Sequence, residues 1–372
     1  INLKMKVPFN YLNHQFNNNK IYFDNWKKLI NSSNFTLGYY VENFEKQFAK
    51  FTKSKHCIAT NTGTDALIIG LKSLGVKPGD EIITVCNTFY ATVGAIVACG
   101  CKPVLVDCDD RYQIDVNGIK KAITKKTKVI MPVHWAGASP NMKIIKKLAD
   151  KYKIKILEDA CMGIGSKIYS KSPGTFGEIG AMSMHPIKSL NVMGDGGMII
   201  TNSDKLASWI RKYRNHGMSD RNHIDFWGTN SRLQPIQAIV AQIELKKVKN
   251  IIKKRNYNAN FLDKELSKIN QIKIPERIVD NTESYVLYIA QFQNRNKIKS
   301  FLIKNGIDVK IHYPLPLHLQ KASKELKYKK GDFPIAEKQA RNILTLPVHQ
   351  YLQRKQLIYI VNKIKEFYKK YD

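Results

Sequence analysis

The stretch Gly180–Asn202, GAMSMHPIKSLNVMGDGGMIITN, decides how the rest of the chain is interpreted. An alternating apolar run ends near Ser183, and a second apolar run follows the glycine-rich turn GDGG at 194–197. A single lysine, Lys188, lies between them, two residues after Pro186. This pattern predicts a lysine on a loop between two strands. Alone it is a weak signal, because the chain has 61 Lys and Arg and a lysine near a turn is usually on the surface.

A second stretch, upstream of the first, changes this interpretation. The run Lys155–Ala160, KILEDA, predicts an apolar strand that delivers a carboxylate at its carboxyl end. A lysine amine and a strand-end carboxylate are the groups that pyridoxal phosphate chemistry requires. The amine forms a Schiff base with the cofactor aldehyde, and the carboxylate keeps the pyridine nitrogen protonated. The two stretches together therefore indicate a catalytic role for Lys188.

Composition indicates a globular protein with a sizeable core. Of the 372 residues 43% are hydrophobic and 10% aromatic, enough for one large domain and a smaller one. No apolar run approaches the ~20 residues of a membrane span, and no signal-peptide pattern is present, so we expect a cytoplasmic protein with no membrane partner. The six cysteines lie mostly in apolar runs without CxxC pairing, so we expect reduced thiols and no metal site.

The net charge of +31 has two interpretations, a nucleic-acid-binding protein or a lysine-rich solvated surface. The lysines are spread over segments where they alternate with apolar positions, and no RNP, helix-turn-helix or zinc-finger pattern focuses the charge. We therefore expect no nucleic-acid partner. A positive field would still attract a phosphorylated cofactor or a nucleotide diphosphate substrate.

Strand and helix signals alternate through the first part of the chain. Apolar runs typical of strands are Cys57–Thr60, Glu81–Val85, Lys102–Asp107, Lys128–His134, Lys153–Glu158, Gly180–Met184 and Met198–Thr201. Helical periodicity occurs at Tyr40–Phe51 and, between the strands, at Thr64–Leu74, Ala91–Cys99, Val116–Ile123 and Met142–Tyr152. This order predicts an α/β fold with a doubly wound, mostly parallel sheet between helices.

The C-terminal part is predicted to form a smaller unit. Pro235 is expected to open a long amphipathic helix that runs to about Lys254 and connects the two units. Short strands are expected within Ser284–Gln293 and Asp308–Tyr313, mixed with helices. We therefore divide the chain into residues 1–250, an N-terminal segment with the large domain, and residues 251–372, a small α+β domain.

Ligands of open α/β sheets bind at the carboxyl ends of the strands, and three of the predicted strands are followed there by residues that could bind a ligand. Asn61–Asp65 opens a helix whose free N–H groups suit a phosphate, although a plain helix cap is the commoner explanation. Phe89 could stack on a cofactor or belong to the core. His134 and Trp135 could contact a substrate or be satisfied at a strand end.

Together these stretches resemble the sugar aminotransferases of the DegT/DnrJ/EryC1/StrS family, which are fold-type I pyridoxal phosphate enzymes. The resemblance covers about Gly38 to Leu346. It rests on motifs in the family's order: TNTGTDAL (60–67), VKPGDEIIT (76–84), PVHWAGASPNM (132–142), LEDACMGIG (157–165), SMHPIKSLNVMGDGG (183–197), RNHG (214–217), GTNSRLQPIQAIV (228–240) and HYPLPLHLQ (312–320). It implies a large domain with a mostly parallel seven-stranded sheet between helices and a small C-terminal α+β domain.

The resemblance also implies catalytic and cofactor-binding residues. Lys188 would be the Schiff-base lysine and, once freed by the amino donor, the base and acid of a 1,3-proton shift. Asp159 would pair with the pyridinium nitrogen, and Phe89 would lie against the ring. The cofactor phosphate would be held by Gly63, Thr64 and Ser183.

Further residues would serve the substrate and a second subunit. Asn230 would reach the phosphate of the neighbouring subunit's cofactor, which implies a homodimer with shared active sites. The substrate side would be lined by His134, His185, Arg232, His312, Tyr313 and His318. One position departs from the family: Met162 stands where a glutamine usually contacts the cofactor's phenolic oxygen, and a thioether is a poor hydrogen-bond partner.

The implied reaction has two halves. An amino donor, most often L-glutamate, loads the cofactor as pyridoxamine phosphate, which then aminates a keto-6-deoxy sugar linked to a nucleotide such as dTDP or UDP. The segment after Lys188 and the motif from His312 favour a 3-keto over a 4-keto sugar. The alternatives are a sugar 3-dehydrase, which has histidine in place of the lysine, and a non-catalytic regulator that binds the cofactor.

Overall fold

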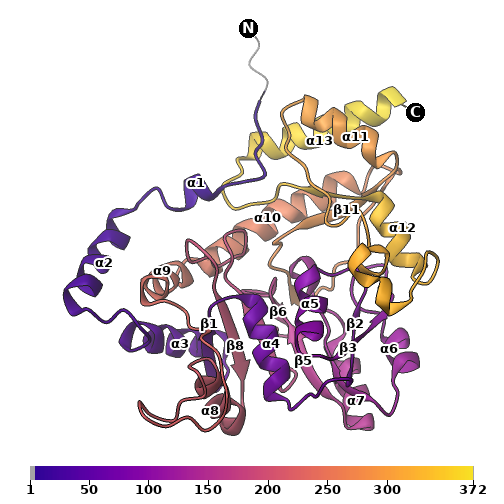
Figure 1. Ribbon diagram of the computed structural model, residues 1–372. Helices are drawn as coiled ribbons and strands as arrows, with labels where there is room; N and C mark the ends of the chain where they lie inside the picture. Colours follow the sequence, from indigo (N-terminus) through magenta and orange to yellow (C-terminus); the bar gives the residue numbers. More distant parts are fainter. Residues whose placement is uncertain (1–4, 372) are drawn as a thin grey trace.

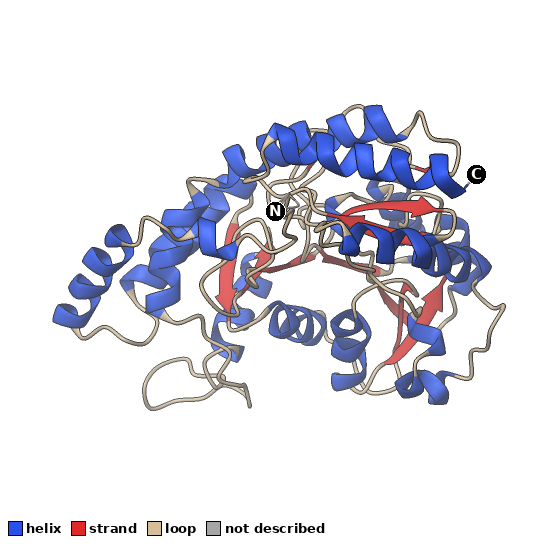
Figure 2. Ribbon diagram, turned by 90° about the horizontal axis from the view of Figure 1, so that it is seen from above, coloured by secondary structure: helices blue, strands red, loops and turns tan. Residues whose placement is uncertain are grey.

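The computed structural model describes residues 5–371, and Figures 1 and 2 show helices surrounding one large sheet. Seven strands form this sheet in the order β1-β8-β7-β5-β4-β2-β3, and only β8 runs against the others. The strands are β1 (His56–Thr60), β2 (Glu81–Val85), β3 (Lys102–Val106), β4 (Thr127–Ile130), β5 (Lys155–Asp159), β7 (Ile179–Ser183) and β8 (Gly197–Thr201). The predicted mostly parallel α/β sheet is confirmed, although β4 ends at Ile130, earlier than predicted.

Helices cover both faces of the sheet because alternate side chains of each strand point to opposite faces. In β2, Ile82 packs in a core with α4, α5 and α8, whereas Ile83 packs in a different core with α6 and α7. Helices α3 and α9 cover the rest of that second face. The bounds are α3 (Tyr39–Thr52), α4 (Gly63–Ser73), α5 (Tyr90–Ala98), α6 (Val116–Ala122), α7 (Met142–Tyr152), α8 (Asp204–Tyr213) and α9 (Pro235–Leu245).

The C-terminal part is built on a three-stranded antiparallel sheet in the order β12-β11-β9. Its elements are α10 (Val248–Leu266), β9 (Ile272–Lys273), β11 (Tyr288–Phe292), α11 (Arg295–Lys304), α12 (Pro334–Asn342), β12 (Ile343–Leu346) and α13 (Arg354–Tyr371). The structure also has short elements. The strand β6 (Lys167–Ile168) pairs with β10 (Asn281–Thr282), and short 3₁₀ helices lie at Trp135–Gly137, Leu317–Leu319 and Lys321–Leu326.

Two predictions for this part were wrong. The long helix from Pro235 is two helices, because α9 packs in the core of the large sheet whereas α10 leads away to a second core through Ala259 and Leu262. The chain turns between them at Lys246–Lys247. The segment Asp308–Tyr313 is not a strand: it pairs only at Lys310, through an isolated bridge to Thr345.

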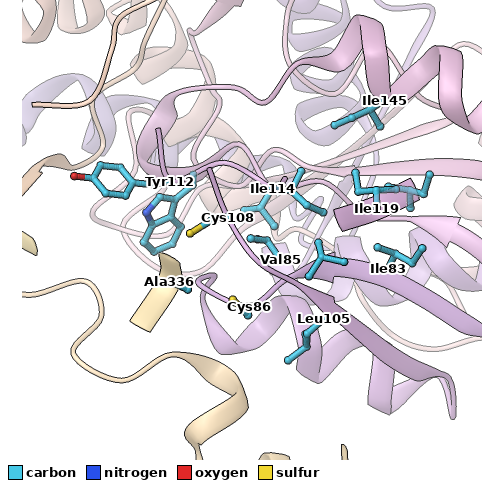
Figure 3. Close-up of a cluster of buried hydrophobic side chains, with 14 of the residues drawn as sticks. Ile83, Val85, Cys86, Leu105, Cys108, Tyr112, Ile114, Ile119, Ile145 and Ala336 are labelled. Carbon is cyan, nitrogen blue, oxygen red and sulfur yellow. The ribbon is translucent and has the colours of Figure 1, made fainter. Parts of the chain in front are cut away.

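The small C-terminal sheet and the large sheet share one core. Ala336 of α12 packs with residues that follow β3, close to Tyr112 and Cys108 (Figure 3). The Cys108 thiol also donates a hydrogen bond to Gln339 Oε1, at 3.0 Å. The predicted boundary at residue 250 falls inside α10, and the division into two domains stays a prediction.

The N-terminal segment runs along the outside of the molecule as α1 (Leu12–Gln15) and α2 (Lys20–Ser32) (Figure 1). Glu244 of α9 holds it in place: this fully buried carboxylate accepts hydrogen bonds from Gln15 and Tyr22. Residues 1–4 of the predicted large domain and residue 372 of the small one lie outside the described residues. Within residues 5–371, no helix combines the length and the apolar character that crossing a membrane requires. All six cysteines are free thiols, as predicted.

Candidate active site

A cavity of about 480 Å³ opens at the carboxyl ends of the parallel strands. Its walls come from the segments after β1, β2, β4, β5 and β7, together with residues 312–313 of the C-terminal part. This is the edge where open α/β sheets bind ligands. Many of the predicted site residues line it: Gly63, Thr64, Phe89, Asp159, Ser183, His185, Lys188, His312 and Tyr313.

Lys188 lies on the loop between β7 and β8, as predicted, and lines the cavity. Its backbone N–H bonds to His185 O at 2.8 Å, which fixes the turn that carries the side chain. Burial lowers the pKa of the Lys188 amine below its ordinary value of 10.5, and the nearby Cys161 and Asp159 only partly oppose this. A lowered pKa makes the neutral, nucleophilic amine more available.

Asp159 is the last residue of β5, and only 4% of it is exposed. Its Oδ2 accepts a hydrogen bond from Thr92 Oγ1 at 2.7 Å, and its Oδ1 accepts one from the Cys161 N–H at 3.2 Å. Because the single hydroxyl proton of Thr92 is donated to Asp159, the 2.8 Å contact between Thr88 and Thr92 must have Thr88 as donor. A chain of two buried hydroxyls therefore orients the carboxylate at the cavity wall.

The start of α4 forms another part of the wall. Thr62 caps this helix, since its Oγ1 accepts the N–H of Asp65 at 2.9 Å, so the helix-cap interpretation is correct for these two residues. Gly63 and Thr64, in the first turn of the same helix, line the cavity together with Ser183. A Cβ on Gly63 would lie 2.8 Å from Ser183 Cβ, so only glycine allows this close approach. Free N–H groups of a helix N-terminus and two hydroxyls are donors that suit a phosphate.

Aromatic rings and a neutral histidine form the remaining wall. The ring centroids of Phe89 and Tyr313 are 6.0 Å apart, and those of Tyr313 and Trp135 are 5.5 Å apart. His312 Nδ1 bonds to Thr345 Oγ1 at 2.9 Å, and burial lowers the pKa of His312 to about 4. Burial likewise lowers the pKa of His185, with a contribution from Lys188. These residues offer stacking surfaces and uncharged ring nitrogens to a ligand.

Two predicted substrate residues, His134 and His318, do not line the cavity. His134 is fully buried, with Nδ1 bonded to Ser139 and Nε2 bonded to Glu158, both at 2.9 Å. His318 is 3% exposed, and its Nε2 bonds to Glu337 Oε1 at 3.0 Å. Protein groups bond both ring nitrogens of His134, whereas His318 Nδ1 has no partner among the described residues, and the substrate roles of both residues stay predictions.

Asn230 and Arg232 lie between α8 and α9, outside the cavity lining. Asn230 is exposed, and its Oδ1 accepts a hydrogen bond from Arg232 Nε at 2.8 Å. Arg232 Nη1 also donates to Asn215 Oδ1 at 3.2 Å. Within one chain neither side chain reaches the cavity, and their predicted roles stay predictions.

Several cavity residues were missed from the sequence. Thr92 is the most important of them, because it is the side chain that donates to Asp159. Its only sequence signal is its place three residues after Phe89, in the first turn of a helix that follows a strand end. The others are Leu67, Thr88, Tyr90, Ala91, Val133, Cys161, Ile187, Asp195 and Leu287.

The chain matches known proteins over nearly its whole length. The DegT/DnrJ/EryC1/StrS aminotransferase family matches residues 18–365. A pleiotropic regulatory protein of Geobacillus stearothermophilus is 37% identical over 92% of this chain and 93% of its own. A dTDP-3-amino-3,4,6-trideoxy-α-D-glucose transaminase of Streptomyces venezuelae is 32% identical over 93% of this chain and 91% of its own.

Solved structures agree with these matches. The structure of S. venezuelae DesV superposes with a TM-score of 0.95 at 32% identity and covers 97% of this chain and 98% of its own. Bacillus subtilis NtdA with bound PMP gives 0.90 at 29% identity and covers 98% of this chain and 86% of its own.

The chain belongs to the DegT/DnrJ/EryC1/StrS aminotransferase family, and its cofactor is pyridoxal phosphate. The cavity fits this cofactor: it offers the Lys188 amine, the fixed Asp159 carboxylate, the Phe89 ring and the phosphate donors at Gly63, Thr64 and Ser183. Met162 supplies no hydrogen-bond donor to it, because its side chain ends in a thioether.

Proposed function

We propose that this aminotransferase moves the amino group of L-glutamate to a keto-6-deoxy sugar carried on a nucleoside diphosphate, dTDP or UDP, and that the ketone is at C3. The observation that carries the proposal is that Lys188 and Asp159 line one cavity at the carboxyl ends of the strands. The 3-keto preference is supported by the S. venezuelae relative, whose name specifies a 3-amino sugar. Such a product belongs to deoxyamino sugar pathways that feed glycan biosynthesis.

When bound, the cofactor supplies an electron sink and carries the amino group between donor and acceptor. Lys188 provides the base and acid. Its Nζ would take the proton from Cα of the amino donor and, in the second half-reaction, would give a proton to the sugar carbon that receives the amino group. Burial favours the neutral amine that this role needs. The Asp159 carboxylate, which Thr92 holds in position, would keep a proton on the ring nitrogen of the bound cofactor.

The remaining walls position the reactants and exclude water. Phe89, Trp135 and Tyr313 offer apolar faces to the ring and to the sugar. His185 and His312 lie on the same lining, and their lowered pKa values favour neutral rings that can bond sugar hydroxyls without a charge cost. These contacts fix geometry, and geometry supplies a large part of the barrier reduction in such reactions.

A homodimer with shared active sites is part of the proposal. Apolar side chains at the cavity are exposed in the single chain: Tyr90 by 67%, Ile187 by 40% and Phe89 by 37%. An exposed apolar surface of this kind suits cover by a second copy. Asn230, exposed and outside its own cavity, is available to the partner's site. Mixing Lys188→Ala subunits with Asn230→Ala subunits should restore part of the activity that each variant lacks alone, and no recovery would contradict shared sites.

We also propose a cytoplasmic location, which the six free thiols support because a reducing compartment preserves them. No nucleic-acid partner is proposed; lack of retention on DNA at physiological salt would support this.

The test of the function uses purified protein loaded with pyridoxal phosphate and given L-glutamate with either a 3-keto or a 4-keto nucleotide sugar. We expect release of 2-oxoglutarate and an amino sugar only in the presence of a keto sugar, with faster turnover of the 3-keto substrate. Exclusive amination at C4 would overturn the 3-keto assignment. Loss of the sugar hydroxyl without amination would indicate the dehydrase alternative.

A further inference from the structure

A second cavity, of about 130 Å³, adjoins the active site. It shares two wall residues with the active-site cavity, Ile187 and Leu287. The N-terminal segment closes it on one side, and the Tyr11 hydroxyl lies 3.5 Å from Lys188 O. We call this cavity the Arg255 pocket, because Arg255 of α10 is the cation that lines it.

Arg255 is a buried cation with no counter-charge from the protein. It is 1% exposed, and its hydrogen bonds go to neutral acceptors: Tyr11 Oη at 2.7 Å, Gln350 Oε1 at 3.0 Å and Tyr285 O at 3.4 Å. Across residues 5–371, no carboxylate forms an ion pair with it. A guanidinium has five N–H donors, so two remain for a ligand. Buried charges are normally paired, which makes this one an exception that needs an explanation.

A comparison with the other buried arginines indicates that Arg255 has more than a structural role. Arg214, also buried, bonds to the carboxylate of Glu45. Arg295 has no carboxylate either, but it donates to Ala340 O and Ile343 O and lines neither cavity. Arg255 combines an unneutralised charge with a cavity wall. Its position therefore matches a binding site better than a packing role.

His349 adds a second unpaired polar atom to the same wall. It is 5% exposed, its Nε2 donates to Pro8 O at 3.0 Å, and its Nδ1 has no partner among the described residues. A ring nitrogen that is buried without a partner costs free energy unless a ligand or water meets it. Because the proton of the neutral ring is on Nε2, Nδ1 is an acceptor that a water or another donor would meet, and Arg255 is the group on this wall that can bind an anion.

We propose that the Arg255 pocket binds a carboxylate of the amino-acid donor. This inference rests on the proposed function, in which the donor is the substrate that always carries carboxylates. A charge-assisted hydrogen bond between a guanidinium and a carboxylate is among the strongest that a site can offer. The shared walls at Ile187 and Leu287 place the pocket next to the loop that carries Lys188. A uronic sugar would bring the same chemical group, so the test separates the two sources.

The test compares Arg255→Gln with Arg295→Gln, a matched loss of a buried arginine away from both cavities. L-glutamate is added to each protein loaded with pyridoxal phosphate, and loss of the visible cofactor band is followed against donor concentration. We expect the half-saturating glutamate concentration to rise about 10- to 100-fold in Arg255→Gln, the range for a lost hydrogen bond to a charged group. Arg295→Gln should leave it unchanged, and the affinity for the keto nucleotide sugar should stay the same in both.

A non-reacting probe keeps the proposal testable where Arg255→Gln does not fold. Glutarate, the dicarboxylate without the amine, should raise the Tm of the wild type in a saturable way, whereas its uncharged dimethyl ester should not. A Tm raised by glucuronate but not by glutarate would assign the pocket to an acidic sugar and overturn the donor assignment. A glutamate dependence that is unchanged in a folded Arg255→Gln would also overturn it.

The proposed function and this inference fail in different ways. If glutarate binds but no amino donor changes the cofactor band, binding of a carboxylate is supported and the proposed glutamate reaction is contradicted. If glutamate reacts normally with Arg255→Gln, the reaction stands and the pocket assignment fails.

Discussion

Glu158 and Asp159 are adjacent carboxylates on β5, and their surroundings and hydrogen-bond partners differ. Glu158 is fully buried and accepts hydrogen bonds from the N–H groups of Gly174, Phe176 and Gly177 and from His134 Nε2, at 2.6–2.9 Å. Asp159 accepts hydrogen bonds from the Thr92 hydroxyl, from the backbone N–H of Cys161 and from the Cys161 thiol, and it lines the active-site cavity. The strand's alternation sends the two side chains to opposite faces.

The difference indicates a structural role for Glu158 and a functional role for Asp159. Every oxygen of Glu158 is satisfied by the protein, so it ties the segment 174–177 to β5. Asp159 keeps hydrogen-bonding capacity for a ligand, because a carboxylate offers about four acceptor sites and Thr92 and Cys161 together use three of them. Spare capacity at a cavity wall is therefore a better sign of function than burial or charge alone.

The largest effect is expected on the cavity side, at Lys188→Ala. This change removes the amine that holds the cofactor and moves the proton, so turnover should fall by roughly 10⁴-fold or more. The visible absorption band of the attached cofactor should also disappear, while circular dichroism and Tm without cofactor stay close to the wild type. Turnover within tenfold of the wild type would remove Lys188 from the mechanism.

Asp159→Asn should come next and should act on chemistry more than on the fold. Asparagine keeps the shape but loses the charge that stabilises a protonated ring nitrogen, so kcat should fall about 10²- to 10³-fold, as for other preorganised electrostatic groups. Kinetics and thermal unfolding, measured on the same preparation, check this. A large loss of Tm with little change in kcat would reverse the comparison with Glu158.

The sequence predicted the large sheet and the centre of the site because both depend on local patterns. Apolar runs located the seven strands of the main sheet, and the motif around Lys188 located the loop correctly. Asp159 could be found because a polar residue that ends an apolar strand is visible in the sequence. These features need no knowledge of which segments meet in space.

Features that depend on distant segments were missed. Thr92 bonds to Asp159 across 67 positions, and nothing in its own helix indicates this contact. His134 has the residue type and strand-end position of a substrate ligand, but Ser139 and Glu158 occupy both nitrogens. The turn between α9 and α10 follows from two separate cores, which periodicity alone does not distinguish.

Glu158→Gln tests the structural side of the comparison. The amide replaces one acceptor oxygen by a donor and sets it against backbone N–H groups, so the free energy of unfolding should fall by roughly 2–3 kcal/mol. Denaturant unfolding without cofactor measures this. The control is Glu366→Gln at an exposed position of α13, which should stay within about 0.5 kcal/mol of the wild type. An unfolding free energy equal to that of the control would show that Glu158 does not hold the loop.

Thr92→Val should give a smaller effect that is confined to the cavity side. It removes the hydroxyl that donates to Asp159 and keeps the shape, so kcat should fall by about tenfold, whereas Thr92→Ser should keep most of the activity. Thr84→Val is the matched control, since Thr84 is equally buried but donates to Met131 O. Equal kinetic losses in Thr92→Val and Thr84→Val would mean that the hydroxyl contributes only to packing.

The smallest effect is expected from His312, which shares the cavity with Lys188. Burial lowers the pKa of His312 to about 4, so the ring is neutral from pH 5.5 upward and changes no charge there. Burial also lowers the pKa of Lys188, and the neutral amine is the form that attaches the cofactor, so attachment should speed up as pH rises and level off below 10.5. The pH profile of attachment in His312→Gln should therefore have the wild-type shape, with rates within about twofold. A step near pH 6.5 that is present in the wild type and absent in His312→Gln would show that His312 titrates there, and the cavity wall would then be more solvated than its burial indicates.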